Sequence, residues 1–118
     1  MKELLKWSLA GALAEWEPAV EAAHRAGFLL SMYGSVLTRD PFIAHANDLD
    51  LIAVPKRKEV DWKELVYALV CRCGWRDAGE PARVSLLGAV SVQLMMCDRL
   101  IDLQIRGVDV GAMDRRFE

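Results

Sequence analysis

Two aspartates alternate with leucines at the start of an apolar run, and this pattern restricts the fold more than any other stretch of the chain. The run reads Asp48-Leu49-Asp50-Leu51-Ile52-Ala53-Val54. Successive side chains of a β-strand point to opposite faces of the sheet. We therefore expect a strand over residues 48–54, with both aspartates on one face and the leucines pointing into a core.

Neighbouring carboxylates on a rigid strand indicate a cation site. Asp48 and Asp50 repel each other unless a positive charge lies between them. Mg²⁺ prefers oxygen ligands and usually binds one or two carboxylates together with substrate phosphates. The pair therefore indicates phosphoryl or nucleotidyl transfer chemistry.

A glycine–serine pair ends an earlier apolar run. Residues 28–34 predict a strand, which Gly34 closes and Ser35 follows. Glycine lets the backbone approach a phosphate closely, and the serine hydroxyl and nearby N–H groups can donate hydrogen bonds to phosphate oxygens. Arg39 follows in the expected loop, where its guanidinium either reaches a phosphate or stays solvated.

A third carboxylate is expected on the last strand, over residues 99–106. Its alternation places Asp102 on the face opposite the apolar residues that point into the core, and Asp98 is the competing candidate. Three carboxylates on neighbouring strands would form an acidic floor. Two metal ions on such a floor can stabilise both the attacking and the leaving oxygen of a displacement.

Helical patterns occur in two stretches. Apolar residues recur at helical spacing over residues 2–26, where Pro18 marks either a kink or the start of a second helix. The stretch 62–73 carries one apolar stripe and follows a capping aspartate, Asp61. We therefore expect an N-terminal helix or helix pair and one internal helix.

The remaining stretches predict further strands. Residues 75–77 fit a short edge strand, and residues 84–96 fit a long strand or a hairpin arm. Mixed strands with helices packed on one face predict an α+β, or α/β, fold. We expect a single domain over residues 1–118, with its core in 28–105 and a polar tail in 107–118.

Composition narrows the function classes. The 118 residues suffice for one domain with a core but not for two. Apolar residues make up 53% of the chain, an excess that indicates a dimer interface or a partner surface. The formal net charge of −2 offers no electrostatic basis for bulk nucleic-acid binding, which needs a basic excess, while local basic patches remain open.

Cysteine usage and hydropathy indicate the compartment. The odd number of cysteines argues against a disulfide framework, and the spacing in Cys71-Arg72-Cys73 does not suit zinc. No stretch approaches the roughly 18 uncharged apolar residues of a membrane span, and the first residues do not read as a signal peptide. We expect a cytoplasmic protein with reduced thiols and no membrane partner.

These motifs together resemble the nucleotidyltransferase superfamily, which has the polymerase-beta-like fold. Its pattern is an apolar strand ending in Gly-Ser or Gly-Gly, an intervening helix or loop, an Asp-apolar-Asp strand, and a third acid on a later strand. Two segments match the first two elements, namely Tyr33-Gly34-Ser35-Val36 and Asn47-Asp48-Leu49-Asp50-Leu51. Leu100-Ile101-Asp102-Leu103 is similar to the third element. The resemblance covers about residues 28–105.

The resemblance implies an activity and a set of roles. Members of this kind transfer a nucleoside monophosphate from a metal-bound triphosphate to an acceptor hydroxyl and release pyrophosphate, with Mg²⁺ or Mn²⁺. By the same resemblance, Asp48 and Asp50 would ligate metal, and Asp102 would ligate metal and activate the acceptor. Gly34 and Ser35 would hold phosphate.

The chain looks most like the minimal members of the superfamily, which are short cytosolic proteins of phages, mobile elements and toxin–antitoxin modules. It has no helical domain after the expected sheet, where larger relatives hold the base or the acceptor. The acceptor therefore stays open between protein and RNA, and a homodimer or a host or toxin protein partner is expected. The alternative is a catalytically inactive relative that acts as a binding protein of the phage or antitoxin type.

Overall fold

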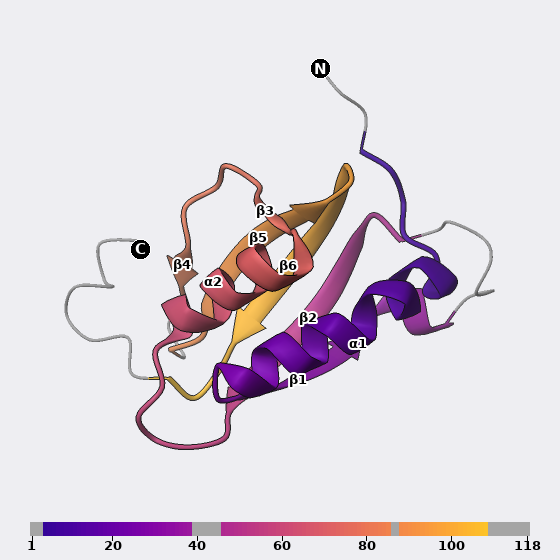
Figure 1. Cartoon of the computed structure of the whole chain (residues 1–118). Helices are drawn as coiled ribbons and strands as arrows, with labels where there is room; N and C mark the ends of the chain where they lie inside the picture. The colour runs from indigo at the N-terminus through magenta and orange to yellow at the C-terminus, as the bar shows by residue number, and fades with distance from the viewer. Residues whose placement is uncertain (1–3, 39–45, 86–87, 109–118) are drawn as a thin grey trace.

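The computed structural model describes residues 4–38, 46–85 and 88–108. Helices and strands form one mixed α+β structure, which confirms the expected fold class (Figure 1). In chain order the elements are α1 (Leu9–Arg25), β1 (Phe28–Tyr33), the 3₁₀ helix η1 (Ser35–Thr38), β2 (Asp48–Pro55), α2 (Trp62–Cys73), β3 (Arg76–Asp77), β4 (Arg83–Val84), β5 (Val90–Met96) and β6 (Arg99–Ile105).

The strands form a single sheet in the order β1-β2-β6-β5-β3, with β4 also pairing with β5. β2 and β6 run parallel, and the other neighbours are antiparallel. The register places Asp50 of β2 opposite Tyr33 of β1 on one side and opposite Asp102 of β6 on the other. Chain segments far apart in sequence therefore meet at the centre of the sheet.

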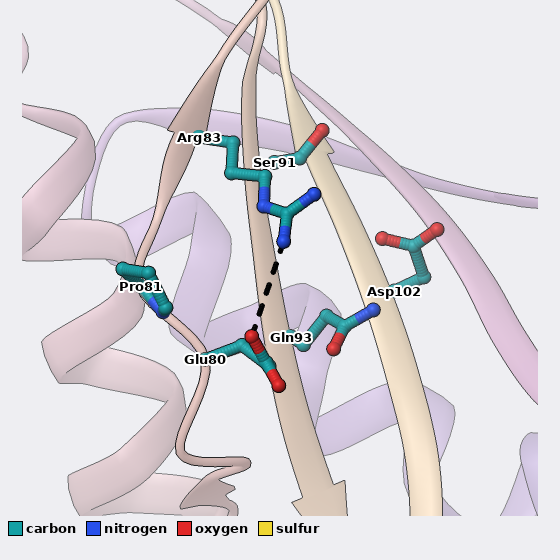
Figure 2. Close-up of a pocket in the computed structure, with 6 residues that line it drawn as sticks. All are labelled: Glu80, Pro81, Arg83, Ser91, Gln93 and Asp102. Carbon is teal, nitrogen blue, oxygen red and sulfur yellow. Dashed lines mark ion pairs between the residues drawn. The ribbon is translucent and has the colours of Figure 1, made fainter. Parts of the chain in front are cut away.

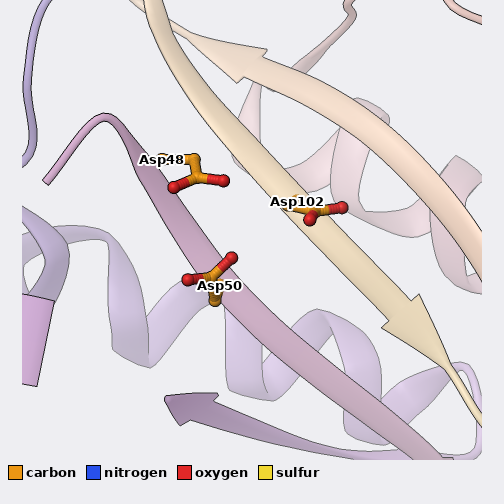
Figure 3. Close-up of side chains that lie close together, drawn as sticks. All are labelled: Asp48, Asp50 and Asp102. Atoms are coloured by element: carbon orange, nitrogen blue, oxygen red, sulfur yellow. The ribbon is translucent and has the colours of Figure 1, made fainter. Parts of the chain in front are cut away.

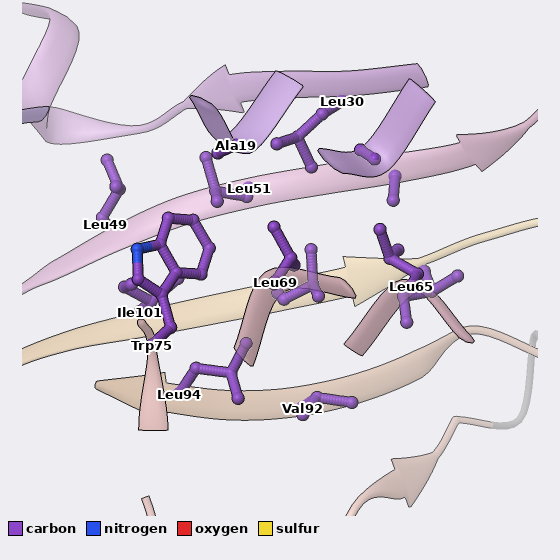
Figure 4. Packing of buried hydrophobic residues seen from close by; sticks show 14 of the residues in the cluster. Ala19, Leu30, Leu49, Leu51, Leu65, Leu69, Trp75, Val92, Leu94 and Ile101 are labelled. Carbon is purple, nitrogen blue, oxygen red and sulfur yellow. The ribbon is translucent and has the colours of Figure 1, made fainter. Parts of the chain in front are cut away.

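Both helices cover the same face of the sheet, as expected. α1 packs against β1 and α2 (Figure 1). Alternate side chains of the central strands are buried on this face. Figure 4 shows these strand side chains around Leu65 and Leu69 of α2, which are fully buried. Burying each such side chain contributes roughly 1.5–3 kcal/mol. The other face, here called the open face, carries the alternate residues of β1, β2, β5 and β6, which are partly or largely exposed.

The N-terminal helix begins later than the sequence pattern predicts. Ser8 is the N-cap of α1 and accepts a hydrogen bond from the Gly11 N–H at 3.0 Å. Residues 4–6 belong to no helix or strand, and Trp7 is fully buried and pairs with Ala46. The prediction of helix from residue 2 is therefore wrong for residues 4–8, because tertiary burial of Trp7 outweighs the local helical pattern.

Pro18 lies inside α1 and does not start a second helix. Proline lacks the N–H that would bond to the carbonyl four residues earlier. Here that carbonyl belongs to Ala14, and both residues are exposed, so water can satisfy it. α1 then ends as expected before Gly27, whose φ is +92°.

The predicted strand over residues 84–96 is divided in two. β4 and β5 pair antiparallel, which selects the hairpin alternative over one long strand. Ser85 accepts hydrogen bonds from Gly88 and Ala89 in the connecting turn. The predicted helix at 62–73, the edge strand near 75–77 and the last strand are confirmed, while residues 109–118 of the predicted tail lie outside the described residues.

Two further expectations concern the state of the cysteines and the presence of membrane-spanning helices. Cys71, Cys73 and Cys97 are free thiols, as expected from their number and spacing. Within the part of the chain that the structure describes, neither helix has the length and apolar character needed to cross a membrane.

Candidate metal and phosphate site

β2 and β6 bring three carboxylates together on the open face (Figure 3). One oxygen each from Asp48, Asp50 and Asp102 can be chosen so that all three lie within 4.8 Å of one another. The two-residue spacing on β2 puts Asp48 and Asp50 on the same face, and the parallel register sets Asp102 beside Asp50. The predicted convergence of these acids is present in the fold.

Asp50 and Asp102 lie where their charged forms are disfavoured. Burial and the neighbouring charges of Asp48 and Asp102 raise the pKa of Asp50 to about 6. Burial and the charge of Asp48 also raise the pKa of Asp102. Like charges in a half-buried site disfavour ionisation, and a cation between the carboxylates would relieve that repulsion.

The donor set fits a hard divalent cation. The cluster offers carboxylate oxygens alone, which suit Mg²⁺ and Mn²⁺, whereas zinc sites more often use cysteine and histidine. Asp48, Asp50 and Asp102 are the residues that would hold such an ion. Mg²⁺ usually keeps several water or phosphate ligands, and the open face leaves room for them.

Gly34 lies directly against the acid cluster. Its φ is +91°, and a Cβ placed on it would collide with Oδ2 of Asp50 and lie 3.3 Å from the Asp50 Cγ. A residue with a side chain would therefore meet both backbone strain and a steric clash. Because Gly34 has no side chain, the main chain after β1 can lie close to the carboxylate of Asp50. A phosphate held at the acids could then approach this main chain closely.

The other predicted phosphate contacts are only partly placed. Ser35 begins η1 immediately after Gly34, and the Leu37 N–H donates to the Gly34 carbonyl at 3.2 Å. Arg39 lies outside the described residues. Ser35 thus directly follows the glycine that lies against Asp50. Its role in holding phosphate stays a prediction.

Asp98 occupies a different position from the acid cluster. It lies in the tight turn between β5 and β6, where Cys97 and Asp98 both have positive φ, and its Oδ1 is 3.7 Å from Nη2 of Arg76. The acid cluster found among the described residues contains Asp102 and not Asp98. The geometry thus selects Asp102 from the two candidates for the third acid.

Two neighbours of the acids were missed in the sequence. Tyr33 faces Asp50 across β1 and β2, and burial followed by the charge of Asp50 raises the pKa of its hydroxyl. Gln93 faces Asp102 across β5 and β6. Their alternation places them on a common face, but the strand pairing that brings them to the acids could not be read from local patterns.

A pocket opens beside Asp102 on the open face (Figure 2). Its volume is about 430 Å³, and its lining residues are Glu80, Pro81, Arg83, Ser91, Gln93 and Asp102. An ion pair of 4.0 Å joins Arg83 and Glu80, and both side chains are largely exposed. Asp102 is therefore accessible from the side of β4 and β5.

No protein-family model and no curated protein matches the chain. The superfamily resemblance accordingly stays a prediction based on the motifs. The acid cluster and the adjacent glycine are the structural features that bear on the chemistry.

Proposed function

We propose that this protein is a nucleotidyltransferase that moves a nucleoside monophosphate from a nucleoside triphosphate to an acceptor hydroxyl of a protein or RNA, with Mg²⁺ or Mn²⁺. The convergence of Asp48, Asp50 and Asp102 beside the backbone of Gly34 carries the proposal. Carboxylates that can hold a cation, next to a backbone that a phosphate can approach, meet the two main requirements of this chemistry.

Each residue of the site has a distinct role in the proposal. Asp48, Asp50 and Asp102 would hold the divalent ion, which when bound neutralises charge on the triphosphate and on the transition state. Gly34 keeps the space beside Asp50 free of a side chain. Ser35 is proposed to hold the triphosphate through hydrogen bonds.

The proposed transfer is a single displacement at the α-phosphorus. The acceptor oxygen forms a bond to that phosphorus as the bond to the bridging oxygen breaks, and pyrophosphate leaves with the electron pair. The hydroxyl proton passes to the carboxylate of Asp102 and from there to water. Asp102 is the carboxylate of the cluster that lines the pocket on the open face, where an acceptor hydroxyl can reach it.

The proposed setting is the cytoplasm, where nucleoside triphosphates are abundant. The free thiols of Cys71, Cys73 and Cys97 are consistent with a reducing compartment. A place in a phage, a mobile element or a toxin–antitoxin module belongs to the same proposal and rests on the resemblance to minimal superfamily members.

Exposed apolar side chains favour a second candidate, a binding protein that keeps the fold without catalysis. Leu29 and Val54 face each other across β1 and β2 on the open face, and they are 55% and 40% exposed. β1 is an edge strand with no charged residue or proline, which are common means of blocking unwanted pairing at a sheet edge. Such an edge suits a partner chain.

Transfer of a labelled nucleotide separates the two candidates. The protein is incubated with Mg²⁺, cell lysate and each α-³²P-labelled nucleoside triphosphate, beside Asp48→Asn and Asp50→Asn. The matched control is Glu59→Gln, which removes an exposed acid from the turn before α2. Label that enters lysate material with the wild type and Glu59→Gln, and is lost with both aspartate variants, supports the enzyme. Transfer that survives both aspartate substitutions contradicts it.

A further inference from the structure

The pocket beside Asp102 lies on the opposite side of the acids from Gly34. One row of residues crosses the open face from β1 to β5, in which Tyr33 pairs with Asp50, Asp50 with Asp102, and Asp102 with Gln93. Gly34 follows Tyr33 at one end of this row, and the pocket opens at the other end. The proposed triphosphate lies at the Gly34 end of this row. The pocket at the other end is therefore free for a second substrate.

The lining of the pocket is polar rather than apolar. Figure 2 shows Gln93 and Asp102 on neighbouring strands, with Ser91 earlier on β5 than Gln93. The size, about 430 Å³, falls within the range of small-ligand pockets. An amide and a hydroxyl around a carboxylate suit a ligand that both donates and accepts hydrogen bonds.

The charges around the pocket disfavour a polyanion. The acids of the lining are Glu80 and Asp102. Among the described residues of the lining, Arg83 is the one cation, and it is already paired with Glu80 at 4.0 Å. Binding of a polynucleotide draws most of its affinity from basic residues that neutralise phosphates, and the described lining offers no basic residue beyond this paired arginine.

We propose that this pocket is the acceptor site, and that it takes the hydroxyl of a neutral or cationic acceptor, not that of a polynucleotide. The inference rests on the proposed nucleotidyl transfer and narrows its substrate class. Gln93 hydrogen-bonds the acceptor beside the attacking hydroxyl and so determines which acceptor is positioned. The hydroxyl points toward Asp102, which takes its proton as the oxygen–phosphorus bond forms and pyrophosphate leaves.

Hydroxyl groups of proteins and of sugars both fit this description of the acceptor. Three probes distinguish these two sources from each other and from RNA, which the inference excludes. They are a short uncharged peptide carrying serine and tyrosine, a neutral hexose, and an RNA hexamer with a free 3′ hydroxyl. Each is titrated into ¹⁵N-labelled full-length protein with Mg²⁺ while the amide signals of Ser91, Gln93 and Asp102 are followed by NMR. Peptide or hexose that shifts these signals at concentrations where RNA does not supports the inference and identifies the source.

A matched pair of glutamine variants tests the role of Gln93. Gln93→Leu removes the amide from the pocket, whereas Gln104→Leu removes one that lies on the same face but outside the pocket lining. Loss of one hydrogen bond worth about 1–1.5 kcal/mol weakens binding about tenfold. We expect that loss for Gln93→Leu and wild-type binding for Gln104→Leu, as read from the Ser91 and Asp102 signals.

The inference is overturned if RNA shifts the pocket signals more strongly than the other probes, if no probe shifts them, or if the two glutamine variants bind alike. A separate measurement tests the metal site on which the proposed function depends. Mn²⁺ with ATP, in a sample without acceptor, should broaden the signals of residues 48–50 and 102. Absence of that broadening counts against the metal site, while the probe titrations still decide what the pocket binds.

Discussion

Asp50 is held in an environment that disfavours its charge. It lies partly buried between two other carboxylates, and its pKa is raised to about 6. An unfolded aspartate ionises near pH 3.9. The folded protein therefore holds this proton over a range in which the unfolded chain has released it, and the carboxylate in the metal-free protein costs stability above that range.

Replacing Asp50 by asparagine should stabilise the metal-free protein at neutral pH. Between about pH 4 and 6 the native state binds more protons than the unfolded state, so the stability of the wild type falls as pH rises through this window. We expect Asp50→Asn to exceed the wild type by about 1 kcal/mol at pH 8, after allowance for solvent screening, and by little at pH 4. Urea unfolding in EDTA measures both values.

A smaller fall of stability with pH should remain in Asp50→Asn, because burial and the charge of Asp48 also raise the pKa of Asp102. A clear loss of stability at pH 8 in this variant would instead assign Asp50 a structural role.

Substitution of Gly34 by alanine should destabilise the protein more than the same substitution at Gly74, another glycine with positive φ. Gly34 has φ +91° and contacts Asp50, whereas Gly74, at the end of α2, has φ +71°, and no heavy atom of the described residues lies within 4 Å of where its Cβ would be. Gly74→Ala meets backbone strain alone, about 1–2 kcal/mol. Gly34→Ala adds the clash with Asp50, which brings its loss to about 2–4 kcal/mol. Thermal unfolding of the two variants, side by side, tests the contact, and equal losses contradict it.

The longer strands β1, β2, β5 and β6 could be predicted well because one face of each is buried. Period-two alternation in β2 and β6 predicts both their bounds and the face of their aspartates. The start of α1 could not be predicted, because the burial of Trp7 depends on β6, far away in the sequence. The β4–β5 hairpin likewise depends on tertiary pairing, since its β-rich sequence fits one strand as readily as two.

The candidate site was predictable to the extent that it is local in sequence. Asp48 and Asp50 follow from their spacing, and Gly34 from the turn after an apolar strand. Asp102 needed the register between parallel strands to distinguish it from Asp98, and local patterns carry no register. Gln93 joins the site through pairing with Asp102 alone, which is why it was missed.

The segment before α1 should fasten the helix layer to the sheet. Trp7 is fully buried, and its Nε1–H donates to the Leu100 carbonyl at 2.7 Å. Trp7→Ala is expected to lower the free energy of unfolding by about 3–5 kcal/mol. Trp7→Phe keeps the ring packing in part but loses the hydrogen bond, and a smaller loss of about 1–2 kcal/mol is expected.

Leu5→Ala is the control for this segment, since its side chain is half exposed and should change stability by less than about 1 kcal/mol. Chemical denaturation measures the free energy of unfolding of the three variants and so ranks their losses of stability. A Trp7→Ala protein as stable as Leu5→Ala would show that the segment does not hold the fold together.

The molecule as a whole separates its core from the proposed site, which lie on opposite faces of one sheet. The helices bury one face, and the other face displays the acids, Gly34 and the polar pocket. The side chains of the open face contribute little to the buried core. Three acids can therefore lie together on that face while the fold stays stable. The repulsion among them is a modest cost to the metal-free protein, and a bound cation should reverse it.

Melting temperature should therefore respond to Mn²⁺ differently in the wild type and in Asp50→Asn. A cation that binds the folded state alone stabilises it, by about 1.4 kcal/mol at ten times its dissociation constant, which raises the melting temperature of a chain this size by several degrees. We expect the variant to melt higher than the wild type in EDTA and to gain little from Mn²⁺. Equal gains in both proteins would place the cation elsewhere.

Calorimetric titration of Mn²⁺ in the presence of ATP tests the acid cluster most directly. The comparison includes the wild type, Asp50→Asn, Asp102→Asn and the Glu59→Gln control, at pH 7.5 and constant ionic strength. We predict that the wild type and Glu59→Gln bind the metal–nucleotide complex alike, and that each aspartate variant binds at least tenfold more weakly. Undiminished binding by Asp50→Asn and Asp102→Asn would contradict the assignment of these carboxylates as metal ligands.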